Sequence, residues 1–229
     1  QSFKNQVGGW LFPDQVTRTS DGFVEVDTGA AVNAGRVEKM SKSKRNVVDP
    51  GLIIKTYGAD TARLFMLSDS PPERDLEWTE SGVEGAFRFL QKIWRLAEQA
   101  DTTGFDFLPF KSAAHSNDTE ELIRTIHSAI ASIGSDIERF AFNKCVASLH
   151  ILVGAISDYR NKDGAEQATF SYALHNLSVL IAPFSPHLAE EIWEKTGGNG
   201  LVSQASWPTA QAEWLTSGEV EIAVQVNGK

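Results

Sequence analysis

A short basic segment holds the side chains in this sequence that are best suited to chemistry. Between residues 36 and 45 it carries one acid, Glu38, and five cations, namely Arg36, Lys39, Lys42, Lys44 and Arg45. Lysine is a compact, mobile point charge, so it can follow phosphate oxygens that gain negative charge as a phosphorus atom is attacked. The segment therefore predicts a loop that binds a polyphosphate and that closes and reopens in each reaction cycle.

The alternative for this segment is an ordinary solvated loop, because runs of lysine and serine are common on protein surfaces. The order of the residues argues against that alternative. Lys39 to Ser43 reads Lys-Met-Ser-Lys-Ser, and a given string of five residues arises by chance in a chain of this length about once in ten thousand. We therefore expect the loop to be functional.

Lys-Met-Ser-Lys-Ser is the signature loop of the class I aminoacyl-tRNA synthetases, and the chain resembles that family beyond the loop. Tyr57 to Phe65 is similar to the stem-contact helices shared by the members for leucine, isoleucine, valine and methionine. Pro71 to Trp78 and Gly82 to Leu90 resemble the leucine-specific members of bacterial type. Ala182 to Trp193 resembles the last helices of their anticodon-binding bundle. The resemblance is good from residue 36 onward and loose before it.

This resemblance implies an enzyme that activates leucine with ATP, in the presence of Mg²⁺, and transfers it to tRNA(Leu). The implied catalytic residues are Lys42 and, second, Lys39, and the implied ATP-binding residues are Lys39, Met40, Ser41, Lys42 and Ser43. The family's leucine pocket, editing domain and histidine-containing ATP motif have no counterpart in this chain. We therefore expect the chain alone to hold no cofactor tightly and to be inactive.

Two alternatives stay open on the sequence. The isoleucine, valine or methionine enzyme is a close runner-up, and the region after Pro72 is what favours leucine. A non-catalytic helical module that binds RNA or protein could also retain such a loop. The family's amino-terminal half is missing, and the strand-like Val224 to Lys229 stops at an Asn-Gly hairpin signal. We therefore expect a piece of a longer protein.

The expected fold is mainly α, with an anticodon-binding helical bundle preceded by a small β-containing region. Four segments are expected: a β-rich segment that ends in the loop (1–48), stem-contact helices (49–80), the bundle (81–212) and the start of a truncated carboxy-terminal domain (213–229). The first segment is too small to hold a core of its own, so it is expected to pack on other parts of the protein.

Local signals place the individual elements. Asp49-Pro50 is a helix cap followed by proline, and Gly58 should end that helix. Ser81 and Glu84 form a capping-box pattern at the start of a long amphipathic helix. Spacing of apolar and turn residues predicts strands at Gly9–Phe12 and, after an Asp21-Gly22 turn, at Phe23–Val26, and helices over residues 59–67, 81–97, 122–137, 143–156, 165–182 and from Ser185-Pro186 to just before Gly197.

Three cations of the long helix fall on one stripe. Arg88, Lys92 and Arg95 are separated by four and three residues, which places them on the same polar face. By the resemblance they would contact tRNA backbone phosphates. The alternative is an ordinary solvated face, and the sequence does not decide between the two.

Composition limits the remaining possibilities. The net charge of −9 over 229 residues argues against a protein whose whole surface binds nucleic acid. There is no apolar run long enough to span a membrane, so we expect a cytoplasmic protein, and we expect a monomer. Cys145 lies in an apolar helical run and is expected to be a buried, inert thiol. The five histidines are not spaced as metal ligands, so no metal site is expected. Trp94 and Trp193 should pack in the core.

Overall fold

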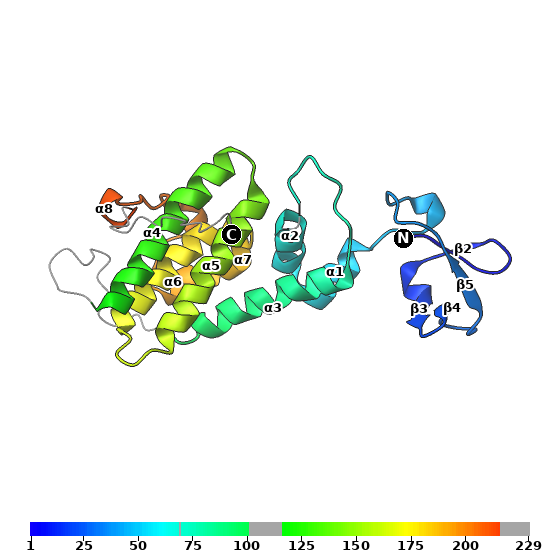
Figure 1. Ribbon diagram of the computed structural model, residues 1–229, viewed down its shortest axis with the longest axis horizontal. Helices are drawn as coiled ribbons and strands as arrows, with labels where there is room; N and C mark the ends of the chain where they lie inside the picture. The colour runs from blue at the N-terminus through cyan, green and yellow to red at the C-terminus, as the bar shows by residue number, and fades with distance from the viewer. Residues whose placement is uncertain (69, 101–115, 216–229) are drawn as a thin grey trace, which may run out of the picture. The chain divides into compact units, whose positions relative to one another are not determined.

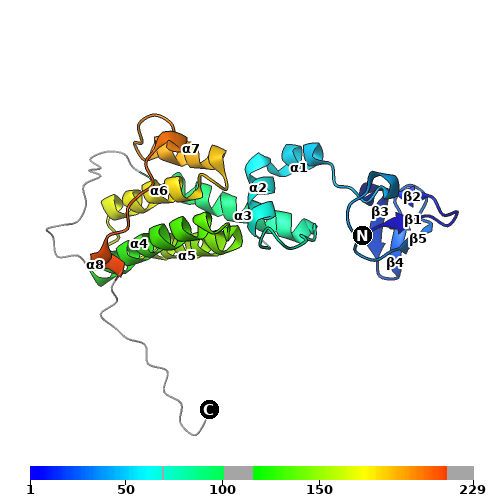
Figure 2. The ribbon, with the colours of Figure 1, turned by 90° about the horizontal axis from the view of Figure 1, so that it is seen from above.

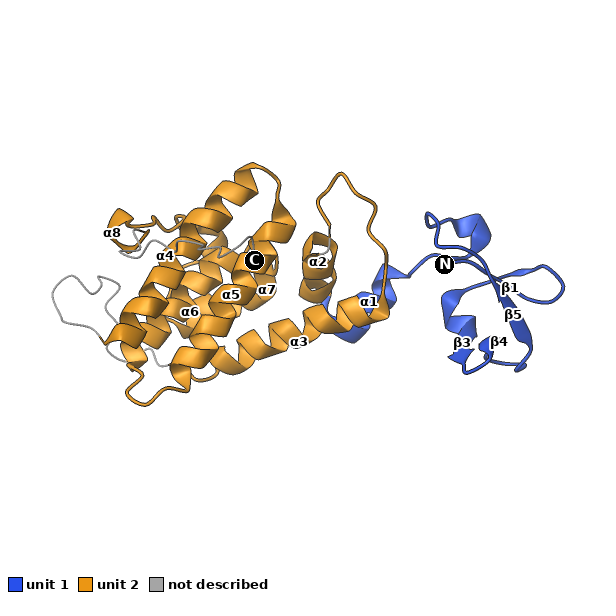
Figure 3. Cartoon of the chain, viewed as in Figure 1, with its two compact units in different colours: residues 1–58 blue, residues 59–229 orange. Residues whose placement is uncertain are grey.

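Residues 1–68, 70–100 and 116–215 are described by the computed structural model of the chain. The backbone divides into two compact units, residues 1–58 and residues 59–229, shown in blue and orange in Figure 3. The first unit holds the strands and the second holds most of the helices. The expected mainly α fold with a small β-containing region is confirmed.

Short strands of the first unit form one curled antiparallel sheet. In the order β2-β1-β5-β4-β3, the strands are β2 (Trp10–Leu11), β1 (Phe3–Lys4), β5 (Ala31–Ala34), β4 (Gly22–Glu25) and β3 (Val16–Thr19). β3 and β4 form a hairpin in which Thr19 lies opposite Gly22. The ring centroids of Phe3 and Phe23 are 5.2 Å apart, and Phe3 and Leu11 are buried. These side chains give the sheet a small apolar centre.

The sequence located some of these strands and missed others. The strands predicted at residues 9–12 and 23–26 correspond to β2 and β4. The hairpin turn is Ser20-Asp21, one residue earlier than predicted, because Gly22 already pairs with Thr19. β1, β3 and β5 were not predicted. They are two to four residues long, and an alternating pattern cannot be recognised over so short a run.

Helix α1 (Pro50–Tyr57) follows the loop, which contains a short 3-10 helix, η2 (Lys42–Lys44). The predicted cap is confirmed, since Oδ1 of Asp49 accepts a hydrogen bond from the backbone N–H of Gly51 at 2.8 Å. Gly58 alone separates α1 from α2 and has a φ of +86°. Glycine adopts this backbone conformation at little cost, so the predicted end of the helix at Gly58 is also confirmed.

The second unit is a bundle of helices (Figures 1 and 2). Helices α4 and α5 are antiparallel and are joined by a short turn, and α6 packs against α4, α5 and α7. The elements are α2 (Ala59–Ser68), α3 (Glu80–Ala97), α4 (Asn117–Glu138), α5 (Phe142–Arg160), α6 (Gln167–Ile181), α7 (Pro186–Lys195), η3 (Val202–Gln204) and α8 (Ala212–Leu215). The helix positions predicted from apolar spacing are confirmed.

The apolar faces of these helices meet in one core. Ile126 and Ile133 on α4 and Leu149 and Ile156 on α5 have no exposed surface. Cys145 is equally buried, as predicted, and its burial raises the pKa of the thiol to about 11. Trp193 packs against the core as predicted. Trp94 is only half-buried and carries the Lys195 ammonium over its ring.

Two predicted helix caps differ from the structure. Thr79, not Ser81, is the residue before α3, and its Oγ1 accepts a hydrogen bond from the backbone N–H of Gly82 at 3.3 Å. Ser81 therefore lies in the first turn. Ser185 does precede α7, but within the described residues its buried hydroxyl makes no hydrogen bond. The N-terminus of α7 is capped by a residue far away in the sequence.

Candidate functional site

The basic loop, residues 39–46, is folded around one buried side chain, Asn46. Its Oδ1 accepts a hydrogen bond from the backbone N–H of Ser41 at 2.7 Å, and its Nδ2 donates to the carbonyl oxygen of Lys39 at 3.3 Å. Arg45 has a left-handed backbone with a φ of +54°, which turns the chain so that Asn46 faces back into the loop. The side-chain amide thus ties the end of the loop to its beginning.

A second set of contacts joins the loop to the start of the chain. Glu38 accepts hydrogen bonds from the ammonium of Lys44 and, at 2.7 Å, from the hydroxyl of Ser2. These two hydrogen bonds, of which the one from Lys44 has the larger effect, hold the pKa of the Glu38 carboxyl below its usual value. The guanidinium of Arg45 lies 5.1 Å from the ring centroid of Phe12. Lys44 and Arg45 are therefore engaged within their own unit.

The two remaining lysines of the loop are arranged differently. Lys39 and Lys42 are exposed, and neither ammonium has an ion-pair partner among residues 1–68, 70–100 and 116–215. The hydroxyls of Ser41 and Ser43 lie 2.9 Å apart beside them. The basic cluster seen in the sequence thus separates into a structural part and a part that can accept an anion.

Sequence reasoning missed the role of Asn46. It follows the last cation of the cluster directly, and nothing in its spacing distinguishes it from a surface asparagine. Its side chain is 5% exposed, and buried amides normally have hydrogen-bond partners. The left-handed backbone of Arg45, which directs Asn46 into the loop, cannot be recognised from the sequence.

The predicted cationic stripe lies on the exposed face of α3. Arg88, Lys92 and Arg95 are all exposed. Arg88 forms a weak ion pair with Glu84 at 3.5 Å, and two-thirds of its side chain remains accessible. Lys92 lies near His150. The pKa of His150 is lowered mainly by the burial of its imidazole and, to a smaller extent, by the positive charge of Lys92. The stripe is therefore a set of accessible cations, two of which have charged or titratable neighbours.

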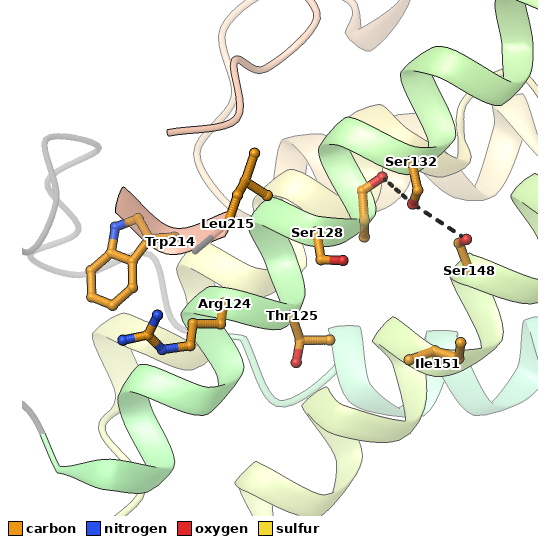
Figure 4. A pocket seen from close by; sticks show the side chains of 9 residues that line it. Arg124, Thr125, Ser128, Ser132, Ser148, Ile151, Trp214 and Leu215 are labelled. Atoms are coloured by element: carbon orange, nitrogen blue, oxygen red, sulfur yellow. Dashed lines mark hydrogen bonds between the residues drawn. The ribbon is translucent and has the colours of Figure 1, made fainter. Parts of the chain in front are cut away.

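A groove of about 320 Å³ runs along α4 and α5 beside α8 (Figure 4). At one end the guanidinium of Arg124 lies 5.4 Å from the ring centroid of Trp214. Ser132 on α4 and Ser148 on α5 meet along its floor, with their hydroxyls 3.4 Å apart. An arginine beside a tryptophan can stack a planar group such as a base. Glu120 lies 3.7 Å from Arg124, however, and offsets its charge. Among the described residues, Arg124 is the one cation that lines the groove, whereas the stripe on α3 has three, so the groove is the weaker candidate for phosphate binding.

Two histidines of the bundle have pKa values that burial lowers. Burial lowers the pKa of His175 to about 4 and also lowers that of His127. His175 Nδ1 lies 3.1 Å from the hydroxyl of Thr196, and His127 Nδ1 accepts a hydrogen bond from the backbone N–H of Gln211. Across the part of the chain that the structure describes, no three histidine, cysteine, aspartate or glutamate side chains gather as metal ligands. Both histidines have hydrogen-bond partners within the bundle.

No helix in the described ranges is both long and apolar enough to cross a membrane. The longest, α4, carries acids and a base between its apolar positions.

The chain matches two known families. Residues 119–229 match the family described as the anticodon-binding domain of tRNA ligase. Residues 11–79 match the family described as tRNA synthetases class I (I, L, M and V). The first match contains most of the helical bundle from α4 onward, and the second contains the basic loop, α1 and α2.

Several bacterial proteins are similar to this chain along its whole length. The leucine–tRNA ligase of Paramagnetospirillum magneticum is 46% identical over 233 residues, and that of Rhizorhabdus wittichii is 48% identical over 229 residues. Both alignments cover 100% of this chain, but only 26% and 25% of the respective relatives. The chain therefore spans about a quarter of the length of the relatives that it matches.

Two solved structures have a similar fold. The ternary complex of LeuRS, tRNA and LeuAMS from Agrobacterium radiobacter matches with a TM-score of 0.70 and 27% identity, over 78% of this chain and 23% of that chain. The methionyl-tRNA synthetase of Mycobacterium tuberculosis in complex with methionyl-adenylate matches with a TM-score of 0.57 and 17% identity, over 70% of this chain and 36% of that chain. The second likeness concerns the fold alone.

Proposed function

We propose that this chain, which belongs to the class I tRNA synthetases, is the part of a leucine–tRNA ligase that supplies the phosphate-binding loop and the helical bundle. The observation that carries the proposal is the identity of 46% and 48% to leucine–tRNA ligases over the whole chain. Of the two similar solved structures, the leucine enzyme is the more similar in sequence, at 27% against 17% for the methionine enzyme. Leucine is therefore the favoured substrate among the related amino acids.

The proposed reaction begins with attack of the leucine carboxylate on the α-phosphorus of ATP, which forms leucyl-adenylate and releases pyrophosphate. Negative charge gathers on the triphosphate oxygens during this step. A cation that meets those oxygens only in the transition state raises the rate without tightening ground-state binding. Lys42, with Lys39 second, is proposed to supply that charge, while Met40, Ser41 and Ser43 complete the ATP-binding loop.

The different surroundings of the lysines support this assignment. Lys42 and Lys39 are exposed, whereas the ammonium of Lys44 is bound by Glu38. A mobile loop lysine can reach a polyphosphate without first breaking an ion pair. The Mg²⁺ that accompanies ATP neutralises phosphate charge, and its protein ligands are expected in the part of the ligase outside this chain.

The bundle is proposed to hold tRNA(Leu), with Arg88, Lys92 and Arg95 on backbone phosphates. Exposed cations on one helix face suit a ligand whose charges repeat along a strand. Within the proposal, residues 49–80 contact the stem of the tRNA, residues 81–212 form the anticodon-binding bundle, and residues 213–229 begin a further domain. We further propose that the full-length ligase is a cytoplasmic monomer.

The test compares three lysine substitutions in the full-length ligase. Lys42→Ala should lower the pre-steady-state rate of leucyl-adenylate formation by about a hundred- to a thousandfold, the usual effect of losing one transition-state charge contact. The Michaelis constant for ATP should change much less. Lys44→Ala should cost far less, because its ammonium is already engaged by Glu38.

Lys55→Ala is the matched control, since Lys55 is an exposed lysine of the same unit on α1. It should leave the rate unchanged. Equal and small effects of Lys42→Ala and Lys44→Ala would show that Lys42 is an ordinary surface lysine. Absence of leucine-dependent pyrophosphate exchange in the unsubstituted ligase would contradict the proposed function itself.

A further inference from the structure

The turn between α6 and α7 is held by two charged side chains of α2. Oδ2 of Asp60 accepts a hydrogen bond from the backbone N–H of Leu188 at 2.7 Å, and Oδ1 accepts one from Nδ1 of His187 at 2.8 Å. One turn further along α2, the guanidinium of Arg63 donates to the carbonyl oxygen of Pro183 at 2.9 Å. These partners are separated from α2 by at least 120 residues in the sequence.

Each charge is placed where a helix end needs it. The first backbone N–H groups of a helix lack partners within the helix, and the N-terminus carries partial positive charge. Asp60 satisfies this end of α7 with a carboxylate that is 12% exposed. Pro183 lies two residues beyond the end of α6, and Arg63 donates a hydrogen bond to its carbonyl oxygen. α2 therefore binds the end of one helix and the start of the next.

The local residue that should cap α7 does not do so. Ser185 is in the N-cap position, but its hydroxyl makes no hydrogen bond within the described part of the chain. A serine cap would have made the turn independent of α2. The turn is closed by its own backbone bonds from the N–H groups of Phe184 and Ser185 to the carbonyl oxygen of Ile181, and the side chains of α2 add the contacts that tie it to another helix.

α2 is also fixed by packing. Its residues Thr61, Leu64 and Phe65 are at most 3% exposed, and the helix packs against α3, α5 and α7 (Figure 2). Only Gly58 separates α2 from α1 in the loop-bearing unit. Packing and the polar contacts therefore hold α2 in one orientation within the second unit.

We propose that Asp60 and Arg63 are positioning residues for the tRNA-dependent transfer of leucine, because they fix α2 on the α6–α7 turn of the tRNA-holding bundle. This inference rests on the proposed function. Formation of leucyl-adenylate does not require tRNA on the bundle, so it does not depend on this contact. Transfer to tRNA requires the bound RNA to be in register with the reacting groups. A displacement of about 1 Å far from the chemistry can lower a rate by about a hundredfold.

The experiment uses the full-length ligase and measures two reactions side by side. Asp60→Asn removes the charge from the carboxylate and weakens its contacts with α7 at nearly constant size. We expect it to lower kcat/KM for tRNA in leucylation by about ten- to a hundredfold. Leucine-dependent exchange of pyrophosphate into ATP should stay within about twofold of the unsubstituted ligase.

Arg63→Met is the milder second variant, since Arg63 is exposed and loses one hydrogen bond. It should show the same split between the two reactions with a smaller loss. Because both side chains hold the same turn, the double variant should lose less than the product of the two single losses. Asp163→Asn, at an exposed turn position after α5, is the matched control and should change neither reaction.

A purely structural role would lower both reactions together, because unfolded ligase carries out neither. That result, or unchanged leucylation in both variants, would overturn the inference. If the unsubstituted ligase fails to charge tRNA with leucine, the proposed function fails instead. The two failures are therefore distinguishable.

Discussion

Replacing Asn46 with alanine in the full-length ligase should loosen the phosphate-binding loop while leaving its lysines in place. The substitution removes the hydrogen bond to the Ser41 backbone N–H at 2.7 Å and the one to the Lys39 carbonyl at 3.3 Å. A typical bond contributes about 1 kcal/mol net, and a buried donor left without a partner costs about 1 to 3 kcal/mol. The longer bond is the weaker of the two, so we expect the folded loop to lose about 2 kcal/mol in total.

A loss of about 2 kcal/mol corresponds to a roughly thirtyfold lower ratio of ordered to disordered loop. The measurable result is a ten- to thirtyfold decrease in kcat/KM for ATP in leucine-dependent pyrophosphate exchange. Thermal unfolding of the variant should be measured in parallel. It should shift little, because unit 1 contributes only a small part of the buried surface of the protein.

Asn33→Ala is the matched control, since Asn33 is an exposed asparagine on β5 of the same unit. It should leave exchange unchanged. If Asn46→Ala changes kcat/KM for ATP by less than about threefold, the loop is ordered by contacts other than the amide. The structural role that we assign to Asn46 would then be wrong.

Two further predictions concern the bundle. The pKa of His175 is lowered to about 4 by burial, so the unfolded chain takes up a proton below about pH 6.5 while the folded chain does not. The free energy of unfolding should therefore fall by about 3 kcal/mol as the pH drops from 7 towards 4. Urea unfolding of the 229-residue chain at several pH values checks this, and His175→Gln should show a smaller pH dependence; an identical dependence would contradict the assignment. Charge reversal of Arg88, Lys92 and Arg95 to glutamate in the full-length ligase should weaken tRNA binding and reduce the slope of log K against log salt by about 2 to 3. Filter binding over a salt series measures that slope, and if neither quantity changes, the stripe is only a solvated face.

Much of the fold was available from local sequence signals. Apolar residues recurring every three or four positions located the long helices, because that spacing is the period of the helix itself. Asp49 was identified as a cap because its partner, Gly51, is two residues away. β1, β3 and β5 could not be found in this way, since each is only two to four residues long and is defined by its pairing with a strand elsewhere in the chain.

The capping errors have the same cause. Ser81 matched a capping pattern, but Thr79 was placed closer to the first free N–H groups of α3 and competed successfully for them. Ser185 stands in the cap position of α7, yet Asp60 takes its place from another helix. Hydrogen-bond acceptors near a helix end are interchangeable, and the fold decides which one is nearest.

In the basic loop, the sequence predicts the residue types but not their contacts. The sequence by itself determined that a cationic, signature-bearing loop lies at residues 39–43 before a capped helix, because residue types and spacing carry that information. Only the tertiary structure decided that Lys44 is bound by Glu38, that Asn46 closes the loop, and that Lys39 and Lys42 remain exposed. An ammonium is the same group in every lysine, and its availability depends on whether folding brings a carboxylate within reach, as Glu38 reaches Lys44 but, in the described part of the chain, neither Lys39 nor Lys42.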